Sequence, residues 1–366
     1  MDDPSFIQRA TPGVQGLRPY EPGKPIDELE REYGVSGAVK LASNENPLGP
    51  SPRAREAVAA RLGELARYPD GNGFALKRAL STWHGVAPEQ ITLGNGSNDV
   101  LELVARAFLA PGLEAVFSEH AFAVYPIVTQ AVGATARVAP ARDYGHDLDA
   151  MRALIGERTR VVFIANPNNP TGTWVEEGAL EAFLDSVPPD VIVVLDEAYV
   201  EYATREGYPD SLPWLARHPN LVVTRTFSKA YGLAGLRVGY ALSHPQIADL
   251  LNRVRQPFNV NSLALAAAEA ALEDQQHIRR AVELNRAGMS FWEDWCRRQG
   301  LAFIPSIGNF ISIDTGRPAG EVYEALLREG VIVRPVANYG LPRHLRISIG
   351  LEEENRRAAQ ALEKVL

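Results

Sequence analysis

Short apolar runs alternate with longer stretches of helical periodicity between about residues 70 and 255. The runs are rich in Val, Ile and Leu, which is typical of strands buried on both faces of a mostly parallel sheet. The stretches between them have the length of the helices that cover such a sheet. We therefore predict an α/β fold with a mostly parallel, seven-stranded sheet flanked by helices. The expected strands are 91–93, 115–117, 136–138, 161–164, 191–195, 221–224 and 238–242.

The C-terminal part of the chain follows a different pattern. An alanine-rich run from Leu263 to Leu272 continues into an arginine-rich stretch, and we interpret the two together as one long linking helix. Beyond it, short strands alternate with two helices, which predicts a smaller α+β domain. The expected strands are 310–313, 331–333 and 345–349, and the expected helices are 319–329 and 352–365.

The N-terminal part has little periodicity and carries prolines at positions 4, 12, 19, 22 and 25, so we interpret it as an arm that leads into a short strand at 39–41. We therefore predict three parts: an N-terminal arm over residues 1–45, a large domain over 46–260, and a linking helix with the small domain over 261–366.

Charge and cysteine content narrow the range of functions. The formal net charge of −8 argues against a nucleic-acid or anionic-membrane partner, because both are bound through basic patches. The single cysteine, Cys296, excludes an intrachain disulfide and is expected to be packing filler in a helix. No leader and no apolar stretch of spanning length are recognisable, so we expect a cytoplasmic protein without membrane contact. We predict no metal site.

Lysine occurs at only five positions, and Lys229 is the one with a chemically informative neighbourhood. It lies in the segment from Thr226 to Ala230, shortly before Arg237. An amine nucleophile that forms a Schiff base must be a lysine, and enzymes that use pyridoxal phosphate hold their cofactor in this way. Lys229 is therefore our candidate for a covalent site.

Asp196 follows the buried run 191–195, and this end of an α/β sheet is where ligands bind. A buried carboxylate needs a partner, and a protonated pyridine nitrogen is a suitable one. An acid at a strand end can equally cap a helix or bind Mg²⁺. What favours the cofactor is Tyr199, whose hydroxyl could donate to a phenolate oxygen. Asn169, on a proline-rich turn after the strand 161–164, could donate to the same oxygen, although such a string is usually only a turn.

The segment Gly94–Asp99 follows a predicted strand and opens a predicted helix, so its free amides and the helix dipole form an anion site. Ser97 and Asn98 are its candidate donors, and an ordinary helix cap is the alternative. The segment lacks the third glycine of a dinucleotide fingerprint and the Lys-Ser/Thr pair of a P-loop, which favours neither NAD nor ATP. Additional contacts to the same phosphate could come from Thr226, Ser228 and Arg237.

Two further side chains suit the same chemistry. Phe122 follows the predicted strand 115–117 and could lay its ring on a pyridine, although such an aromatic is more often part of the core. Arg346 lies in the predicted strand 345–349, where a buried guanidinium matches a carboxylate. The alternative for Arg346 is a surface salt bridge.

Together these residues resemble fold type I pyridoxal phosphate aminotransferases, within which histidinol-phosphate aminotransferases are the most similar. The resemblance covers almost the whole chain and implies a large domain like that of aspartate aminotransferase. The segments that carry it are Asn44–Pro50, Arg67–Asp70, Ala165–Gly172, Asp196–Tyr199, Phe227–Arg237 and Leu345–Gly350. Phe122 departs from the family, in which many members have a tyrosine, so stacking is retained while a hydrogen bond is in doubt.

The resemblance implies a role for each candidate. Lys229 would be the Schiff-base lysine and proton shuttle, Asp196 would pair the pyridine nitrogen, and Phe122 would stack on the ring. Asn169 and Tyr199 would hold the phenolate oxygen. The phosphate would be bound by Ser97, Asn98, Ser228 and Arg237, and by Tyr68 from the other subunit of a homodimer. Arg346 and Asn46 would meet the substrate at its carboxyl or hydroxymethyl position, and Arg334, with Tyr20 from the arm, would meet the substrate phosphate.

The implied reaction is transamination of histidinol phosphate with 2-oxoglutarate, which yields imidazole-acetol phosphate and glutamate in histidine biosynthesis. An aromatic amino acid aminotransferase is the main alternative, because a pocket for imidazole also suits a phenyl ring. A phosphothreonine decarboxylase is a second alternative, and a noncatalytic ligand-sensing module is a third. A Rossmann dehydrogenase lacks support because its fingerprint is missing.

Overall fold

The computed structural model describes residues 6–20 and 23–366, and it contains the predicted seven-stranded sheet. The strand order is β2-β10-β9-β8-β7-β3-β4, in which β10 runs antiparallel to β2 and β9 while the remaining pairs are parallel. All seven predicted strands are confirmed to within two residues at each end. Their bounds are β2 Ile91–Gly94, β3 Glu114–Ser118, β4 Thr135–Ala139, β7 Thr159–Ala165, β8 Ile192–Asp196, β9 Leu221–Thr226 and β10 Gly239–Ser243.

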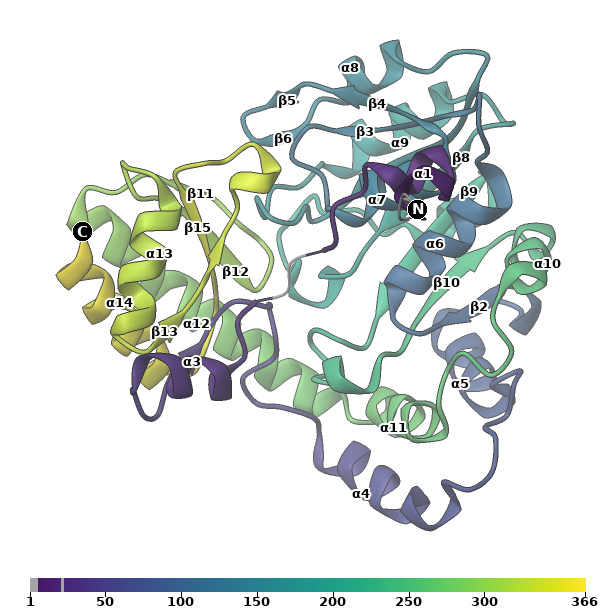
Figure 1. Ribbon diagram of the computed structural model, residues 1–366. Helices are drawn as coiled ribbons and strands as arrows, with labels where there is room; N and C mark the ends of the chain where they lie inside the picture. Colours follow the sequence, from purple (N-terminus) through teal and green to yellow (C-terminus); the bar gives the residue numbers. More distant parts are fainter. Residues whose placement is uncertain (1–5, 21–22) are drawn as a thin grey trace, which may run out of the picture.

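Helices cover both faces of this sheet, and each face has its own apolar cluster (Figure 1). The helices on one face are α5 (Phe74–His84), α8 (Leu148–Ala153), α9 (Glu177–Ser186) and α11 (Ser262–Glu273), with α4 (Pro52–Arg61) packed on α11. Those on the other face are α6 (Ser97–Phe108), α7 (Val124–Ala131) and α10 (Pro245–Val254). Because both faces of the central strands β7 and β8 are buried, these strands are largely apolar, which explains their Val, Ile and Leu runs. The edge strand β4 is mostly exposed and carries Thr135 and Arg137.

A second, four-stranded sheet has the order β11-β12-β15-β14 and is antiparallel. Its strands are β11 Phe303–Ile304, β12 Phe310–Asp314, β14 Arg334–Pro335 and β15 His344–Ser348, and it packs with α13 (Ala319–Arg328) and α14 (Glu352–Val365). The predicted strand 331–333 is present as β13 (Val331–Ile332), which pairs with β1 (Val39–Lys40) outside the small sheet. The strand that joins the small sheet is β14, which follows Val333 and was not predicted. The chain therefore changes partner at Val333.

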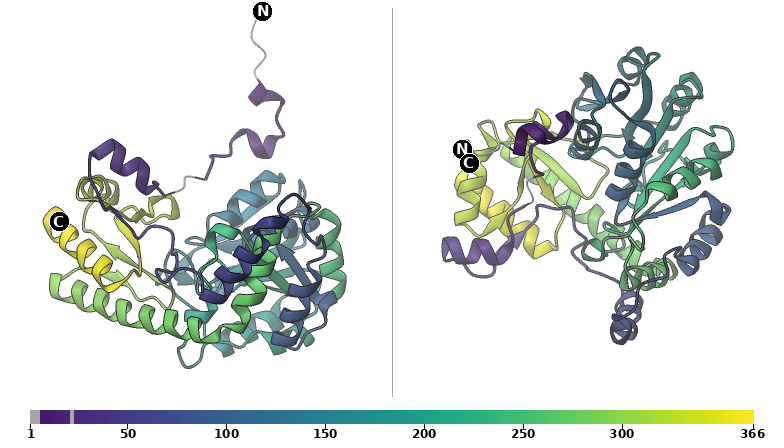
Figure 2. Two further views of the ribbon diagram at one scale, coloured as in Figure 1. Left: turned by 90° about the horizontal axis from the view of Figure 1, so that it is seen from below. Right: turned by 45° about the vertical axis from the view of Figure 1, so that its right-hand side comes forward.

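The expected single linking helix is wrong. Two helices are present, α11 and α12 (Gln275–Gln299), and Asp274 separates them with φ −96° and ψ 61°. The Asp274 side chain accepts a hydrogen bond from the amide of His277, so it caps α12 instead of continuing α11. Helix α12 then runs from the large sheet to the small one (Figures 1 and 2).

The N-terminal segment contains three helices that periodicity did not predict: α1 (Phe6–Arg9), α2 (Pro12–Gln15) and α3 (Ile26–Tyr33). Helix α2 contacts α7, and α1 extends beyond it (Figure 2). Helix α3 buries Leu29 against residues of α13 and β13, and the Tyr33 hydroxyl donates to Glu324 at 3.0 Å. No helix within the described residues is long and apolar enough to cross a membrane.

The two sheets are joined at the loop after β7. The Ser312 hydroxyl of β12 donates to the carbonyl of Pro170 at 2.6 Å, and the Ile307 amide donates to the carbonyl of Gly172 at 3.0 Å. Gly172 has φ 74°, and a Cβ added there would lie 2.0 Å from the Ser306 Oγ. Only glycine therefore lets these two chain segments lie this close together.

We expect Gly172→Ala to lower the free energy of unfolding by about 2–4 kcal/mol, because it combines a strained backbone with an overpacked contact. Urea denaturation measures this change. The matched control is Gly178→Ala in α9, where an added Cβ has open space and helix propensity favours alanine, so stability should rise by up to about 1 kcal/mol. Equal stabilities of the two variants would contradict the proposed contact.

Candidate active site

A cavity lies at the carboxyl ends of β7, β8 and β9, where the large sheet faces β14 and β15 of the small sheet. Parallel strands of an open α/β sheet present their ligand-binding loops at this edge. All predicted site residues except Asn46 and Tyr68 line the cavity. Those that do are Tyr20, Ser97, Asn98, Phe122, Asn169, Asp196, Tyr199, Thr226, Ser228, Lys229, Arg237, Arg334 and Arg346.

Lys229 follows β9 and points its amine at the cavity wall opposite. Its Nζ donates to the carbonyl of Ser43 at 3.1 Å and lies 5.6 Å from the centre of the Tyr199 ring. Burial, followed by the guanidinium of Arg346, lowers the pKa of Lys229 to about 7. A large share of these amines is therefore uncharged at neutral pH, as a nucleophile or base requires.

Asp196 is the last residue of β8 and is 4% exposed. Both of its carboxylate oxygens accept hydrogen bonds, from the Tyr125 hydroxyl at 2.9 Å and from the Thr224 hydroxyl at 3.1 Å. Burial raises the pKa of Asp196, whereas these two donors act in the opposite direction. A cationic partner in the cavity would further favour the ionised carboxylate.

Asn169, Tyr199 and Arg346 form one hydrogen-bonded wall of the cavity. The Asn169 Oδ1 accepts from Arg346 Nη1, so its amide nitrogen remains available as a donor. The Tyr199 hydroxyl accepts a hydrogen bond from Asn44 Nδ2 at 2.9 Å. Burial raises the pKa of Tyr199 to about 12, so it stays a hydroxyl donor across the physiological range. Arg346 is 6% exposed, which excludes the alternative of a surface salt bridge.

The N-terminus of α6 forms an anion-sized cup at the cavity floor. Helix α6 begins at Ser97, and no side chain caps its free amides. Arg237 reaches over this end: a Cβ placed on Gly96 would lie 2.5 Å from Arg237 Nη2. Arg237 Nη1 also donates to the Ser228 hydroxyl at 3.2 Å. Helix amides, a guanidinium and a hydroxyl thus converge as a phosphate requires.

Thr226 and Phe122 complete the floor and one side. The Thr226 hydroxyl accepts from the Ser228 amide at 3.1 Å and donates to the Val238 carbonyl at 3.5 Å, so its hydrogen bonds stay within the loop. The Phe122 ring meets the Tyr125 ring edge to face, with centroids 5.9 Å apart. Phe122 therefore packs against the residue that holds Asp196.

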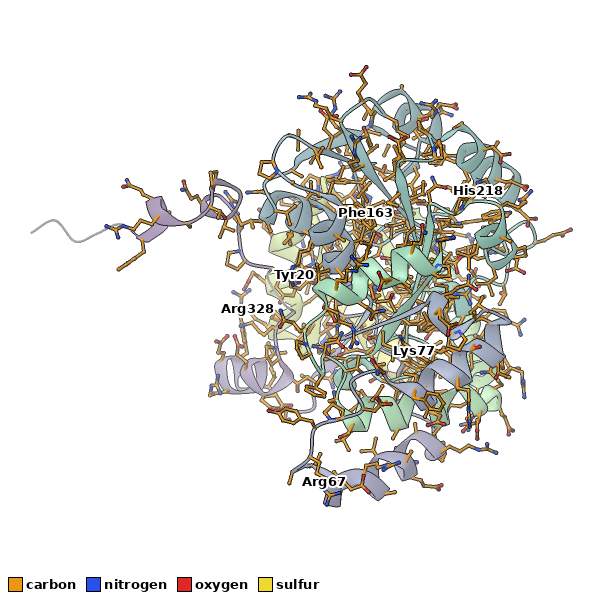
Figure 3. All side chains as sticks on the ribbon, turned by 90° about the vertical axis from the view of Figure 1, so that its right-hand side faces the viewer. Tyr20, Arg67, Lys77, Phe163, His218 and Arg328 are labelled. Carbon is orange, nitrogen blue, oxygen red and sulfur yellow. The ribbon has the colours of Figure 1, made fainter. Side chains whose placement is uncertain are left out.

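Tyr20 and Arg334 lie together at the outer part of the cavity. The Arg334 guanidinium lies 5.5 Å from the centre of the Tyr20 ring, which is a cation–π contact between the N-terminal segment and β14. Tyr20 is labelled where this segment meets the body of the molecule (Figure 3). Both residues also line an adjoining groove formed with α7. The cavity therefore continues outward along the N-terminal segment.

Asn46 and Tyr68 lie outside the cavity of this chain. Asn46 is buried, where its amide donates to the Ala230 carbonyl and its Oδ1 accepts from the Leu48 amide, so it stabilises the turn beside Lys229. Tyr68 is 83% exposed and stacks on Phe258 with ring centroids 4.7 Å apart. Its neighbour Arg67 is labelled at the lower end of the molecule in Figure 3, whereas Tyr20 is labelled near mid-height.

Sequence reasoning assigned no role to three residues that hold the site together: Tyr125, Thr224 and Asn44. Tyr125 lies in the first turn of α7 and Thr224 in the middle of β9, and their polarity in an apolar run was the only available signal. Asn44 belongs to the segment Asn44–Pro50, which carried part of the family resemblance. Its left-handed backbone, with φ 55°, is not visible in the sequence.

Comparison with known proteins agrees with this geometry. The family model described as aminotransferase class I and II matches residues 36–362. Histidinol-phosphate aminotransferase 2 of Pseudomonas aeruginosa is 67% identical, with 99% of this chain and 98% of the relative covered. Histidinol-phosphate aminotransferase 1 of Nitrosococcus oceani is 59% identical over 100% of this chain and 99% of the relative.

Solved structures share the fold over nearly the whole chain. The histidinol-phosphate aminotransferase of Sinorhizobium meliloti, solved in complex with pyridoxal 5′-phosphate, superposes with a TM-score of 0.90 at 32% identity and covers 98% of this chain and 97% of its own. Aspartate aminotransferase of Thermus thermophilus, at 22% identity and a TM-score of 0.85, covers 97% and 99% and shares the fold. The predicted aspartate aminotransferase-like fold is therefore confirmed. A match over most of the chain, together with a lysine and an aspartate facing one cavity at the sheet edge, means that the chain belongs to the class I and II aminotransferase family.

Proposed function

We propose that this protein is a pyridoxal phosphate-dependent aminotransferase that converts histidinol phosphate and 2-oxoglutarate to imidazole-acetol phosphate and glutamate. A relative that bears this name is 67% identical over 98% of its own length. The single observation that carries the proposal is the convergence of Lys229, Asp196 and the α6 N-terminus with Arg237 on one cavity. An amine, a buried acid and an anion cup are the three groups that this cofactor requires.

The described residues fit the cofactor at each of its polar groups. The uncapped amides of Ser97 and Asn98, with Ser228 and Arg237, suit its phosphate. Asp196, with both oxygens already supported by donors, suits a cationic pyridine nitrogen. The free amide of Asn169 and the hydroxyl of Tyr199 suit its phenolate oxygen, and Phe122 suits one face of its ring. Thr226 lines the same floor with its hydroxyl turned into the loop.

Pyridoxal phosphate, when bound, supplies an aldehyde to which an amine can bond and a ring that accepts electrons from the substrate Cα. Asp196 would keep that ring cationic. Lys229 Nζ would accept the proton of the substrate Cα and return it, because burial and Arg346 bring its pKa near neutrality. The carbonyl of Ser43, which accepts a hydrogen bond from Lys229 Nζ, would keep the amine in position between the two proton transfers.

Substrate choice depends on the arginines at the two ends of the cavity. Arg346, fixed by Asn169 and by the carbonyl of Ala42, suits the carboxyl or hydroxymethyl end of the substrate. Arg334, with Tyr20, suits a phosphate at the outer end. Asn46 would act on the substrate only indirectly, through the turn that it holds. The same pocket could take a phenyl ring, so an aromatic aminotransferase is the alternative that experiment must separate.

We also propose the predicted division into an arm (1–45), a large cofactor-binding domain (46–260) and a linking and small domain (261–366), with the arm contributing Tyr20 to the substrate site. A homodimer is part of the proposal, in which Tyr68, exposed and outside the cavity of its own chain, would reach the cofactor phosphate of the other subunit. Exposed large apolar side chains between the end of α4 and the start of α5 support it, because exposed apolar surface favours association: Leu62, Leu65, Tyr68 and Phe74. A cytoplasmic location stays a prediction of the sequence.

The test of this function compares kcat/KM for histidinol phosphate and for phenylalanine. We expect histidinol phosphate to be strongly preferred, and Arg334→Gln to raise its KM roughly tenfold or more while phenylalanine is little affected, because a charge-assisted contact to phosphate is lost. Arg343→Gln, which removes an exposed arginine paired with Asp314, is the matched control. Equal use of phenylalanine would instead identify an aromatic aminotransferase, and carbon dioxide release from phosphothreonine would identify a decarboxylase.

The pKa of Lys229 predicts how its amine reacts in the cofactor-free protein. Below about pH 7 the amine is protonated, and above that value it is free, so trinitrobenzenesulfonate should label Lys229 with a midpoint near pH 7. Lys24 is the internal comparison, because Glu32 and Glu28 raise its pKa and should delay its labelling to strongly alkaline solution. Peptide mapping of labelled protein measures both.

Lys229→Ala should abolish turnover and retain some noncovalent cofactor binding; retained turnover would refute the assignment.

The position of Tyr68 predicts complementation between inactive subunits. In a mixed dimer of Lys229→Ala and Tyr68→Ala chains, one site would have neither change if Tyr68 acts in the partner's site. After random exchange, activity should therefore recover to about a quarter of the wild-type value per subunit. Activity that never exceeds that of the Tyr68→Ala protein alone would mean that Tyr68 acts within its own chain or not at all.

A further inference from the structure

Asn44 is a buried residue at the cavity wall whose polar groups are all engaged. It is 1% exposed, lines the cavity, and belongs to the segment between β1 and α4, where it contacts strand β15 of the small sheet. Its carbonyl accepts from Asn309 Nδ2 at 3.0 Å, and its main-chain amide donates to the Ser348 hydroxyl at 2.8 Å. Its side-chain amide contacts Ser348 on one side and Tyr199 on the other.

The donor and the acceptor of each of these hydrogen bonds can be assigned. The Asn44 main-chain N–H can only donate, so the Ser348 oxygen accepts from it, and the Ser348 hydrogen is then free to be donated to Asn44 Oδ1 at 3.0 Å. This contact identifies the oxygen end of the amide, and the nitrogen end faces the Tyr199 hydroxyl at 2.9 Å. The orientation of the Asn44 amide thus follows from the Ser348 hydroxyl, whose hydrogen has Asn44 Oδ1 as its acceptor among the described residues.

The consequence falls on the hydrogen of the Tyr199 hydroxyl. Because the Tyr199 oxygen accepts from Asn44, its own hydrogen must point elsewhere, and none of residues 6–20 and 23–366 accepts it in the structure. Tyr199 lines the cavity, so its hydrogen is presented there as a donor. Asparagine suits this position twice, since its amide supplies the donor and its backbone tolerates the observed left-handed φ of 55°.

We propose that Asn44 is a positioning residue for the reaction, which orients the Tyr199 hydroxyl so that it donates into the cavity, with Ser348 fixing the orientation of the Asn44 amide. The inference rests on the proposed function, because the acceptor in the cavity is the phenolate oxygen of the cofactor. It adds that a strand of the small sheet controls the donor to that oxygen. The neighbouring carbonyls of Ser43 and Ala42 accept hydrogen bonds from Lys229 and Arg346. The same short segment therefore positions Lys229, Arg346 and, through Asn44, Tyr199.

The test is a pH titration of the visible absorption band of the holoenzyme, which needs no turnover. A donor to the phenolate oxygen stabilises its anionic form and keeps the titration midpoint low. Tyr199→Phe removes the donor, and Asn44→Gly removes its orientation while permitting the left-handed backbone. We expect both changes to raise the midpoint, by up to about one pH unit, and to raise the cofactor dissociation constant roughly three- to tenfold.

Asn44→Asp is the sharper variant, because it keeps the shape and reverses the last hydrogen bond. A carboxylate at position 44 can only accept, so Tyr199 would turn its hydrogen away from the cavity. The midpoint should rise at least as far as in Tyr199→Phe. In a Tyr199→Phe background the Asn44→Gly change should add nothing, and Asn44→Asp should add only the effect of its charge, because residues that act through one another are not additive.

Asn220→Asp is the matched control. Asn220 is a buried amide just before β9, at the opposite end of that strand from Thr226, and it donates to the carbonyl of Val191 at 2.7 Å. It should show a similar loss of thermal stability with an unchanged midpoint. Two outcomes would overturn the inference while leaving the proposed function in place. In the first, the wild-type band titrates with pH and both Asn44 variants have the wild-type midpoint. In the second, the midpoint shifts caused by the Asn44 changes are equally large in the Tyr199→Phe background. If the wild-type protein forms no visible band with pyridoxal phosphate, the proposed function fails first.

Discussion

A carboxylate buried at the end of a central strand is the constraint around which this site is organised. Asp196 lies at the edge of the sheet with 4% of its surface exposed, and an isolated charge there would be strongly unfavourable. Tyr125 from one layer and Thr224 from the adjacent strand donate to its two oxygens. These donors make an ionised carboxylate tolerable, but burial still raises its pKa, so a cation in the cavity gains more from Asp196 than an exposed acid could offer.

The same burial acts in the opposite sense on Lys229. Desolvation disfavours its charged form, and the guanidinium of Arg346 adds repulsion, so the pKa of the amine falls to about 7. Asp196, which a cation would stabilise, and Lys229, which loses its proton near neutral pH, thus face the same cavity. Arginine supplies the permanent positive charges around them, which lets the one lysine of the site remain a base.

The sequence was sufficient to predict the sheet and the identity of most cavity residues, because both follow from short-range patterns. Buried parallel strands require apolar runs, and ligand residues follow directly at their carboxyl ends, as Asp196 and Asn169 do. The break at Asp274 and the separate strand β14 were missed for a different reason. Each depends on a local choice of hydrogen-bond partner, for which an alanine-rich or valine-rich run carries no signal.

The least predictable part is the linkage between the two sheets. Leu41, Ala42 and Asn44 bond to β15 residues that are about three hundred positions away in the sequence, and no periodicity relates them. Yet this contact decides which way the Tyr199 hydrogen points and where the Lys229 amine rests. A displacement of the small sheet would therefore act on the amine, the phenol and Arg346 together, since all three are held by one short segment. Arg346 and the hydrogen-bond partners of Lys229 and Tyr199 thus belong to one connected part of the structure.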